Sequence, residues 1–426
     1  MFPESNIKEM SSLKFVDLNY RPTSNDLICL FRVTPNRVSI KEAANIVALE
    51  SSVGTWVEVK TKKDYVNKLA AKVFSIKGDM VKIAYPQGLF EGDNAPNILS
   101  SIAGNVFGMK VVNGLRLESV EFPQKLLKSF RGPRYGIPGI RRIMQVKNRP
   151  FVGTIIKPKL GLKTEDHAKA AYDSWIGGCD IVKDDENLSS QEFNRFEKRA
   201  SKTLEMKDRA EQETGERKAY LINVTAETGE MLKRADLVKS LGGKFVMIDI
   251  LTSGFAAVQT LRKNVTLAIH AHRAMHGAFT ENKKHGISML TIAEFARLIG
   301  VDTLHIGTAV GKMRGDFKEV RQIEDEIEFQ RVKESDIRLK QNWSNIRPVM
   351  AVSSGGLCAL NIPFLIKHFG IDQIIQAGGG VHGHPQGTVA GAKSLRQAVD
   401  ASLKGISLKN YATNHPELEQ ALKKFG

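Results

Sequence analysis

The chain has 426 residues, of which 42% are hydrophobic and 25% charged, so it can bury a large core and has the composition of a globular protein, not of a disordered or fibrous one. No apolar run reaches the ~18 to 20 residues that span a bilayer, and the start, "MFPESNIKEMSS", lacks the basic-then-apolar order of a secretory signal. The net charge is +16, but the basic residues are spread along the chain without a basic block or zinc-finger spacing, which favours a solvated basic surface over nucleic-acid recognition.

The region before about residue 135 alternates short strands and helices. In chain order we predict a strand, a helix, a strand, a hairpin, a helix and a strand at 25–35, 39–51, 54–61, 70–86, 94–108 and 110–123. The hairpin turns at Gly78. This order predicts a small ferredoxin-like α+β domain over residues 1–135, which ends in the Gly- and Pro-rich segment 130–139.

From residue 136 to 426 one unit recurs, namely a short β-branched run, a turn and an amphipathic helical stretch. Eight such runs lie at 151–157, 179–183, 219–225, 245–251, 265–272, 302–307, 347–353 and 373–378. Eight strands that alternate with helices predict a (β/α)8 TIM barrel as the catalytic domain. The alternative is a doubly wound open sheet, but the first strand–helix turn, "KPKLGLK", is not the GxGxxG turn of a dinucleotide-binding fold.

In a barrel, chemistry is concentrated at the carboxyl ends of the strands. Polar residues and glycines gather at or after six of the eight predicted strands: Lys157, Lys159, Lys183, Asp185, Glu186, His272, Arg273, His305, Lys312, Ser354, Gly356, Gly378 and Gly379. Each alone is typical of a solvated strand end, a satisfied core histidine or a tight turn. Together they indicate one site, because a closed barrel directs all of these ends to one mouth.

The stretch "GGCDIVKDDENL" at 177–188 places Lys183 beside two carboxylates that share its side of the chain. Asp185 and Glu186 supply oxygen ligands of the kind that Mg²⁺ prefers. An ammonium cannot be a metal ligand, so Lys183 is either an ion-pair partner of the carboxylates or a modified, neutralised lysine that supplies oxygens. Asp184 points to the opposite face by alternation, and we do not expect it to be a ligand.

Two further clusters suit anions. The glycines of "SSGG" and "GGG", with Ser354, let backbone N–H groups approach a phosphate after strands seven and eight. Arg273 and His305 could hold a second phosphate across the mouth. Two anion sites with a metal between them indicate a sugar bisphosphate that reacts through an enediolate.

With these motifs, the chain resembles the large chain of ribulose-bisphosphate carboxylase/oxygenase (RuBisCO), from "FVDLNYRP" at 15–22 to "GGGVHGHPQG" at 378–387. The motifs that carry the resemblance are "ESSVGTW" (50–56), "AGNVFG" (103–108), "GTIIKPKLGL" (153–162), "GGCDIVKDDEN" (177–187), "HAHRAMHGAF" (270–279), "LHIGTAVGKMRGD" (304–316) and "SSGG" (353–356). "VKDDEN", "HRAMHGAF" and the missing long C-terminal tail are most similar to the archaeal, type III kind.

The resemblance implies a role for each matching residue. Lys183 becomes a carbamate by reaction with CO2, binds Mg²⁺ with Asp185 and Glu186, and removes the C3 proton of ribulose 1,5-bisphosphate. Lys157 and His272 transfer protons, and Lys312 steadies the incoming CO2. The remaining matches bind substrate: Lys159, Arg273, His305, Ser354, Gly356, Gly378, Gly379, Thr55 and Trp56, with Glu50 and Asn105 reaching the site of a partner chain.

The resemblance also implies the reaction and its setting. CO2 or O2 adds to the enediolate, and carboxylation gives 3-phosphoglycerate, in archaea as part of AMP or nucleoside salvage. The expected assembly is a homodimer or a multiple of dimers with shared active sites, without a small subunit, nucleic acid or membrane. Cys29, Cys179 and Cys358 are far apart without CxxC spacing, which fits free thiols in a cytoplasmic protein.

Two other functions remain as alternatives. A RuBisCO-like protein would enolise or isomerise a related sugar phosphate without fixing CO2, but such proteins typically lose several of the residues that are present here. A basic nucleic-acid-binding protein on a degenerate barrel is suggested by the net charge alone.

Overall fold

The structure is a computed structural model that describes residues 14–55, 57, 59–311 and 316–426. The chain folds into two compact units, and each is considered by itself. The first takes in residues up to Arg131 together with Met275–Leu298 and Phe329–Ile346, and the second contains Gly132–Ala274, Ile299–Glu328 and Arg347–Gly426. The boundary between the units, after Arg131, lies close to the predicted one, but two later segments of the chain also belong to the first unit. The domain limits of 1–135 and 136–426 therefore remain a prediction.

The first unit is built on one five-stranded sheet in the order β10-β4-β1-β3-β2. Its strands and main helices are β1 (Asp26–Pro35), α2 (Ile40–Glu50), β2 (Lys72–Lys77), β3 (Met80–Pro86), α3 (Ala95–Ala103), β4 (Val112–Glu121) and β10 (Gly286–Ile287). The first six follow one another as βαββαβ, which is a ferredoxin-like order and differs from the predicted one by the absence of the strand at 54–61. β10 extends the sheet by pairing parallel to β4.

Further elements complete this unit. They are η1 (Asp64–Leu69), η2 (Gln87–Leu89), η3 (Val106–Gly108), α4 (Gln124–Leu127), α11 (Gly277–Thr280), α12 (Met289–Ile299), β12 (Arg331–Val332) and β13 (Gln341–Asn342). Local signals explain the main elements. Ser39 and Glu42 form a reciprocal capping box at the start of α2, and Gly78 adopts a φ of +60° in the turn between β2 and β3.

The strand predicted at 54–61 is wrong for the residues of this segment that the structure describes, 54–55, 57 and 59–61. They form turns and irregular backbone, and Thr55 Oγ1 donates to the carbonyl of Val57 at 2.5 Å. The Val57 side chain, which the alternating pattern would bury, is 64% exposed. Alternation alone does not make a strand when no neighbouring strand pairs with it.

The second unit contains a closed barrel in the order β11-β14-β15-β5-β6-β7-β8-β9, and all of its neighbouring strands are parallel. The strands are β5 (Phe151–Ile155), β6 (Ile181–Lys183), β7 (Ala219–Asn223), β8 (Phe245–Asp249), β9 (Ala268–His272), β11 (Thr303–Gly307), β14 (Met350–Ser354) and β15 (Gln373–Gln376). Each coincides with one of the eight predicted runs, so the TIM-barrel prediction is confirmed.

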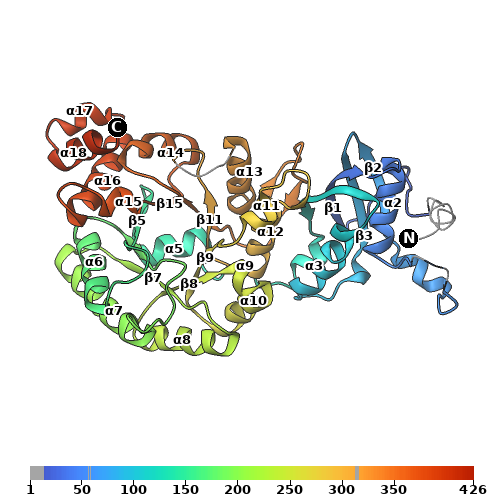
Figure 1. The fold of residues 1–426 in the computed structure, drawn as a ribbon, viewed down its shortest axis with the longest axis horizontal. Helices are drawn as coiled ribbons and strands as arrows, with labels where there is room; N and C mark the ends of the chain where they lie inside the picture. Colours follow the sequence, from blue (N-terminus) through green and yellow to red (C-terminus); the bar gives the residue numbers. More distant parts are fainter. Residues whose placement is uncertain (1–13, 56, 58, 312–315) are drawn as a thin grey trace. The chain divides into compact units, whose positions relative to one another are not determined.

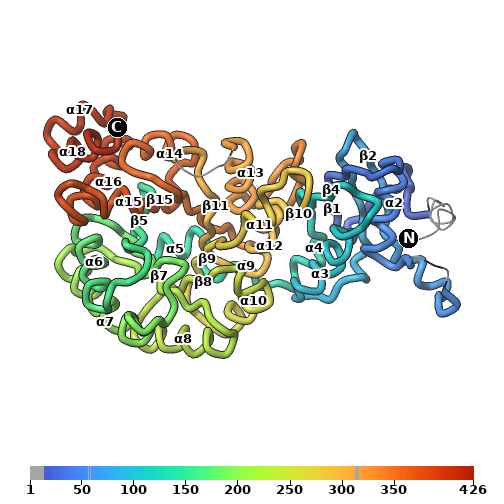
Figure 2. The backbone as a smooth tube through the Cα atoms, in the orientation of Figure 1, coloured from blue at the N-terminus to red at the C-terminus, as the bar shows by residue number. Residues whose placement is uncertain are grey.

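Helices follow the strands along the chain, as the colour sequence of the tube in Figure 2 makes clear. They are α5 (Gly136–Met144), α6 (Thr164–Ile176), α7 (Phe196–Thr214), α8 (Thr228–Ser240), α9 (Ile250–Ser253), α10 (Phe255–Asn264), α13 (Phe317–Glu328), η4 (Ala359–Asn361), α14 (Ile362–Phe369), α15 (Gly379–His382), α16 (Thr388–Leu403), α17 (Leu408–Ala412) and α18 (Pro416–Phe425). Figure 1 shows α6, α7, α8 and α10 on the outside of the barrel strands.

The barrel interior changes from apolar to polar along its strands. Its buried core includes Ile181 on β6, Ala268 on β9, and Val352 and Ile374 on β14 and β15. Since side chains alternate, the inward residues two positions further on are Lys183, His270, Ser354 and Gln376. The core therefore ends where polar groups begin, at the carboxyl ends of the strands.

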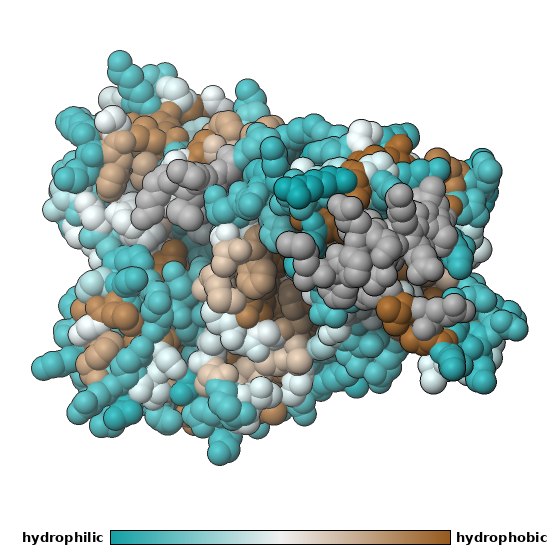
Figure 3. All heavy atoms as spheres, turned by 45° about the vertical axis from the view of Figure 1, so that its right-hand side comes forward, coloured by the Kyte–Doolittle hydropathy of each residue, from teal (hydrophilic) through white to brown (hydrophobic). Residues whose placement is uncertain are grey.

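The surface drawn in Figure 3 is mostly hydrophilic, with hydrophobic residues in several separate patches. Scattered exposed apolar side chains of this kind are ordinary for a folded protein. Among the helices of the described ranges, none has the length and apolar character that a membrane crossing requires.

Candidate active site

The carboxyl ends of the barrel strands bring together the three predicted catalytic residues that the structure describes. Lys157 follows β5, Lys183 ends β6, and His272 ends β9. Because the strands are parallel and the barrel is closed, their ends meet at one mouth. The residues predicted to bind phosphate, Ser354, Gly356, Gly378 and Gly379, lie at or after the ends of β14 and β15.

Two lysines face two carboxylates at this mouth. Lys157 Nζ donates to Asp185 Oδ2 at 2.8 Å. Lys183 is fully buried, and its Nζ lies 3.2 Å from Glu186 Oε2 and donates to the carbonyl of Asp184 at 2.7 Å. Burial alone would raise the pKa of Glu186, but the charges of Lys183 and His272 lower it to about 2. The surroundings of Glu186 therefore favour its anionic form.

His272 connects this cluster to β8. Its Nε2 lies 3.7 Å from Glu186 Oε2, and its Nδ1 lies 2.9 Å from Asp249 Oδ1. A carboxylate can only accept a hydrogen bond, so it selects the ring form that carries a proton on Nδ1. The arrangement leaves Nε2 to face the lysine–carboxylate cluster.

The predicted anion contacts at the far side of the mouth also come together. His305 Nδ1 and Ser354 Oγ are 2.7 Å apart. The Arg273 guanidinium lies against Gly307, where a Cβ atom would come within 2.6 Å of one of its nitrogens. Gly307, at a φ of +94°, thus makes room for Arg273 beside His305.

A second close approach occurs between β5 and β15. A Cβ atom on Gly378 would lie 3.0 Å from Lys157 Cε, so a larger residue there would press on the lysine stem. This glycine therefore places Lys157 next to the proposed phosphate loop. Lys159, two residues further on, is exposed.

Three predicted substrate residues belong to the first unit. Asn105 Nδ2 donates to Glu50 Oε1 at 3.3 Å, so these two side chains lie together, and Thr55 lies in the irregular segment after α2. Trp56 and Lys312 lie outside the described residues. The roles of all five residues therefore remain predictions.

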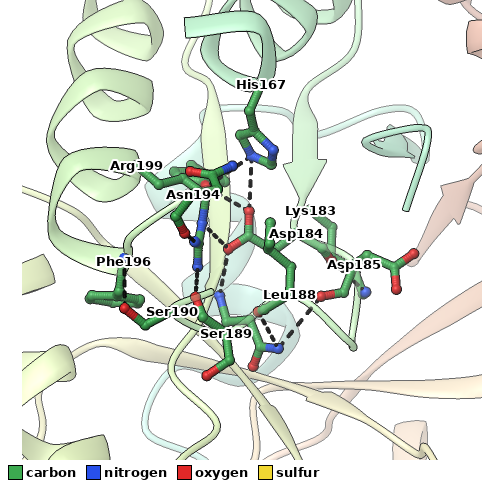
Figure 4. A network of polar contacts seen from close by, with 12 residues as sticks. His167, Lys183, Asp184, Asp185, Leu188, Ser189, Ser190, Asn194, Phe196 and Arg199 are labelled. Carbon is green, nitrogen blue, oxygen red and sulfur yellow. Dashed lines mark hydrogen bonds and ion pairs between the residues drawn. The ribbon is translucent and has the colours of Figure 1, made fainter. Parts of the chain in front are cut away.

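Asp184 lies on the other face of the strand end from Lys183 and is the centre of a buried polar network (Figure 4). Its carboxylate accepts from Tyr220 Oη at 2.5 Å and from the backbone N–H of Asn223 at 3.0 Å, and it lies 3.1 Å from His167 Nε2 and 3.2 Å from Arg199 Nε. Burial would raise the pKa of Asp184, but Arg199 and the hydrogen bonds hold it well below its ordinary value. The network anchors the backbone between Lys183 and Asp185.

The residues that hold a metal in this arrangement would be Asp185 and Glu186. Among the described side chains, no group of three or more His, Cys, Asp and Glu residues is placed to hold a metal ion. Two carboxylates beside a buried lysine fit Mg²⁺ when the lysine itself becomes an anionic oxygen donor. The donor set is thus compatible with the predicted carbamate on Lys183.

Sequence reasoning missed several polar residues of the mouth. Asp249 and Asn223 end β8 and β7, the two predicted strands at whose ends no site residue was predicted. The Asn223 amide donates to the carbonyls of Glu186 and Leu188 at 3.1 and 3.0 Å. Gln376 ends β15, and neither atom of its buried amide has a hydrogen-bond partner among the described residues. In each case the signal was a polar residue as the last residue of an apolar strand.

Comparison with known proteins gives a consistent result. The family model for the ribulose bisphosphate carboxylase large chain, catalytic domain, matches residues 136–425, and that for its N-terminal domain matches 14–126. The chain is 50% identical to a ribulose bisphosphate carboxylase of Methanocaldococcus jannaschii, over 96% of this chain and 99% of that protein. It is 49% identical to one of Pyrococcus furiosus, over 97% of each.

Solved structures agree with these relatives. The dimeric archaeal Rubisco from Hyperthermus butylicus has a TM-score of 0.93 and 48% identity, over 97% of this chain and 99% of that one. The octameric enzyme from Pyrococcus horikoshii has a TM-score of 0.91 and 47% identity, over 97% and 96%.

Proposed function

The chain belongs to the ribulose bisphosphate carboxylase large-chain family, and on that premise we propose that it is a carbon–carbon lyase that converts ribulose 1,5-bisphosphate and CO2 into 3-phosphoglycerate. The observation that carries the proposal is the cluster of Lys157, Lys183, Asp185 and Glu186 at the barrel mouth, with His272 held beside it by Asp249. We expect that this enzyme, like others of its family, also accepts O2 in place of CO2 in a side reaction.

Lys183 is proposed to be the activated residue. Its ammonium would lose one proton to give the neutral amine, which would bond to the carbon of CO2 and release a second proton as the carbamate anion forms. That change replaces a buried cation by an anion, so Asp185, Glu186 and Lys183 together would hold Mg²⁺. When bound, the ion would polarise the substrate carbonyl and stabilise the charge of the enediolate.

The chain's own groups then have separate roles. Lys183, as the carbamate, would accept the C3 proton of the substrate. His272, with its Nε2 turned to the site, would move a proton during hydration. Lys157 would protonate the product carbanion, and its contact with Asp185 keeps the ammonium at the cluster until then.

Substrate binding is proposed to use the two phosphate sites predicted from the sequence. Arg273, His305 and Ser354 would bind one phosphate, and the contact of His305 with Ser354 and the position of Arg273 against Gly307 support this. The other phosphate would lie at Gly356, Gly378 and Gly379, with Thr55 and Trp56, and Lys159 and Lys312 would act beside it. We propose a homodimer or a multiple of dimers, without a small subunit, in which Glu50 and Asn105 complete the partner's site.

A ¹⁴CO2-fixation assay with ribulose 1,5-bisphosphate, Mg²⁺ and bicarbonate tests the carboxylase proposal. Labelled, acid-stable 3-phosphoglycerate is the expected product. Exchange of the C3 proton with solvent, without label in the product, would instead indicate a RuBisCO-like enolase or isomerase. We further propose that the enzyme acts in the cytoplasm, in AMP or nucleoside salvage. Growth of a deletion strain on nucleosides would test that role.

A further inference from the structure

Four side chains form a continuous row of hydrogen bonds beneath the mouth of the barrel. Thr303 Oγ1 lies 2.7 Å from His270 Nδ1, and His270 Nε2 lies 2.9 Å from His305 Nε2. His305 Nδ1 lies 2.7 Å from Ser354 Oγ. The row, called the histidine relay below, joins β9, β11 and β14 and ends at a half-buried serine of the proposed phosphate site.

The three inner members of the relay are shielded from water. Thr303, His270 and His305 are 1%, 0% and 3% exposed. Burial, together with the nearby positive charges of Lys183 and His272, lowers the pKa of both relay histidines well below the ordinary value. Each ring is therefore neutral at physiological pH, with one nitrogen that donates and one that accepts.

These contacts allow only two directions of donation. In the first, Thr303 donates to His270, His270 donates from Nε2 to His305, and His305 donates from Nδ1 to Ser354. The Ser354 hydroxyl then accepts from the ring and keeps its own proton for a further acceptor. In the second direction each hydrogen bond is reversed. Ser354 then donates its proton to His305 Nδ1, His305 donates from Nε2 to His270, and His270 donates from Nδ1 to Thr303.

An anion distinguishes the two directions. A phosphate oxygen beside Ser354 can only accept, so it is bound by the first direction and not by the second. We propose that Thr303 and His270 are positioning residues that turn the Ser354 hydroxyl toward a phosphate group of the substrate. The inference rests on the proposed function, since it takes the ligand at Ser354 to be a sugar bisphosphate.

The relay also changes the role of His305. Both of its ring nitrogens are engaged, Nε2 with His270 and Nδ1 with Ser354. In the phosphate-binding direction His305 donates to Ser354, and the serine donates to the anion. His305 thus acts on the phosphate through Ser354.

The first experiment reads the proton positions directly. The whole protein, labelled with ¹⁵N-histidine, is saturated with orthophosphate, and the two rings are assigned with the variants His270→Gln and His305→Gln. We expect a proton on Nε2 of His270 and on Nδ1 of His305. Any other pair of ring forms in the phosphate-saturated protein overturns the inference.

The second experiment removes the first donor. Thr303→Val keeps the shape but leaves His270 Nδ1 without a donor, whereas Thr303→Ser keeps the hydroxyl. We expect Thr303→Val to raise the Kd for orthophosphate and the KM for ribulose 1,5-bisphosphate about 3- to 10-fold, the effect of one hydrogen bond. The change in kcat should be smaller, and Thr303→Ser should bind like the parent.

An effect on folding alone would lower the melting temperature without changing the Kd of the folded protein, and it would contradict the relay. So would a Thr303→Val protein that binds orthophosphate as tightly as the parent. The ring forms and the Kd for orthophosphate are measured without turnover, so the two proposals can fail separately. The predicted ring forms without CO2 fixation would overturn the proposed function, and CO2 fixation with reversed ring forms would overturn the relay.

Discussion

His272 Nδ1 lies 2.9 Å from Asp249 Oδ1, which ties the proposed proton-transfer residue at the end of β9 to a carboxylate at the end of β8. The backbone N–H of Ala274 also points at His272 Nδ1, at 3.2 Å. One ring nitrogen cannot donate and accept in the same ring form, and the shorter contact to a carboxylate favours donation. Asp249 therefore orients His272 with Nε2 free to exchange a proton.

We expect Asp249→Asn to lower kcat roughly 10-fold or more, within the ~10²- to 10⁴-fold contribution of an acid–base group. The amide no longer stabilises a charged ring and can present its N–H to Nδ1, which would reverse the ring form. Steady-state ¹⁴CO2 fixation measures the effect. The exposed Asp236→Asn on α8 is the matched control. Unchanged kcat in Asp249→Asn would remove Asp249 from the mechanism.

Lys183→Ala should abolish CO2 fixation, because the proposed activation forms a carbamate on this amine. The parent, incubated with ¹³CO2 and Mg²⁺, should give a carbamate signal by NMR that the variant lacks. Since the ammonium must lose a proton before its nitrogen can attack CO2, activation should also rise with pH. Lys202→Ala removes a 41% exposed lysine of a surface ion pair and should leave turnover unchanged. Fixation by the Lys183 variant would contradict the proposal.

The eight barrel strands could be predicted because each is a short β-branched run between glycine-rich turns, a signal that is local in the sequence. The pairs that make the site could not be predicted in the same way. His272 and Asp249 are brought into contact by two neighbouring strands, and Thr303 and His270 are 33 residues apart in the chain. The strand predicted at 54–61 is wrong for a related reason. Its alternating pattern is local in the sequence, but a strand also needs a neighbouring strand to pair with, and none pairs with this segment among the described residues.

Asp184→Asn should destabilise the fold by about 3 kcal/mol or more, because it leaves the buried guanidinium of Arg199 without its counter-charge. The folded-state pKa of Asp184 is depressed, so its stabilisation is complete above the ordinary value of 3.8 and is lost as the pH falls below it. Denaturant unfolding should therefore show a large gap between parent and variant at pH 7 that narrows below pH 3.8.

The control for Asp184 is Asp173→Asn on α6, which breaks a surface pair with Lys169 and should cost at most about 1 kcal/mol. Equal losses in the two variants would show that the buried network does not stabilise the strand end. A gap that stayed constant in acid would show that Asp184 is not ionised in the folded protein.

Gln376→Met should raise the free energy of unfolding and weaken substrate binding at once. The Gln376 amide is buried at the mouth without a hydrogen-bond partner among the described residues, and each unsatisfied buried polar group costs about 1 to 3 kcal/mol. Methionine has a similar length and removes that cost. We also expect the amide to bind hydroxyl groups of the sugar bisphosphate, so its loss should increase the KM for ribulose 1,5-bisphosphate severalfold.

Gln373→Met on the same strand is the matched control for Gln376. Gln373 is also buried, but it bonds to Ser353 Oγ at 2.9 Å and to the carbonyls of Leu365 and Gly370 at 3.0 and 2.8 Å. Its replacement leaves those groups unpaired and should destabilise the protein without a direct effect on KM. Denaturant unfolding and substrate titration separate the two cases. A Gln376→Met protein that is more stable with an unchanged KM would mean that the amide does not contact the substrate.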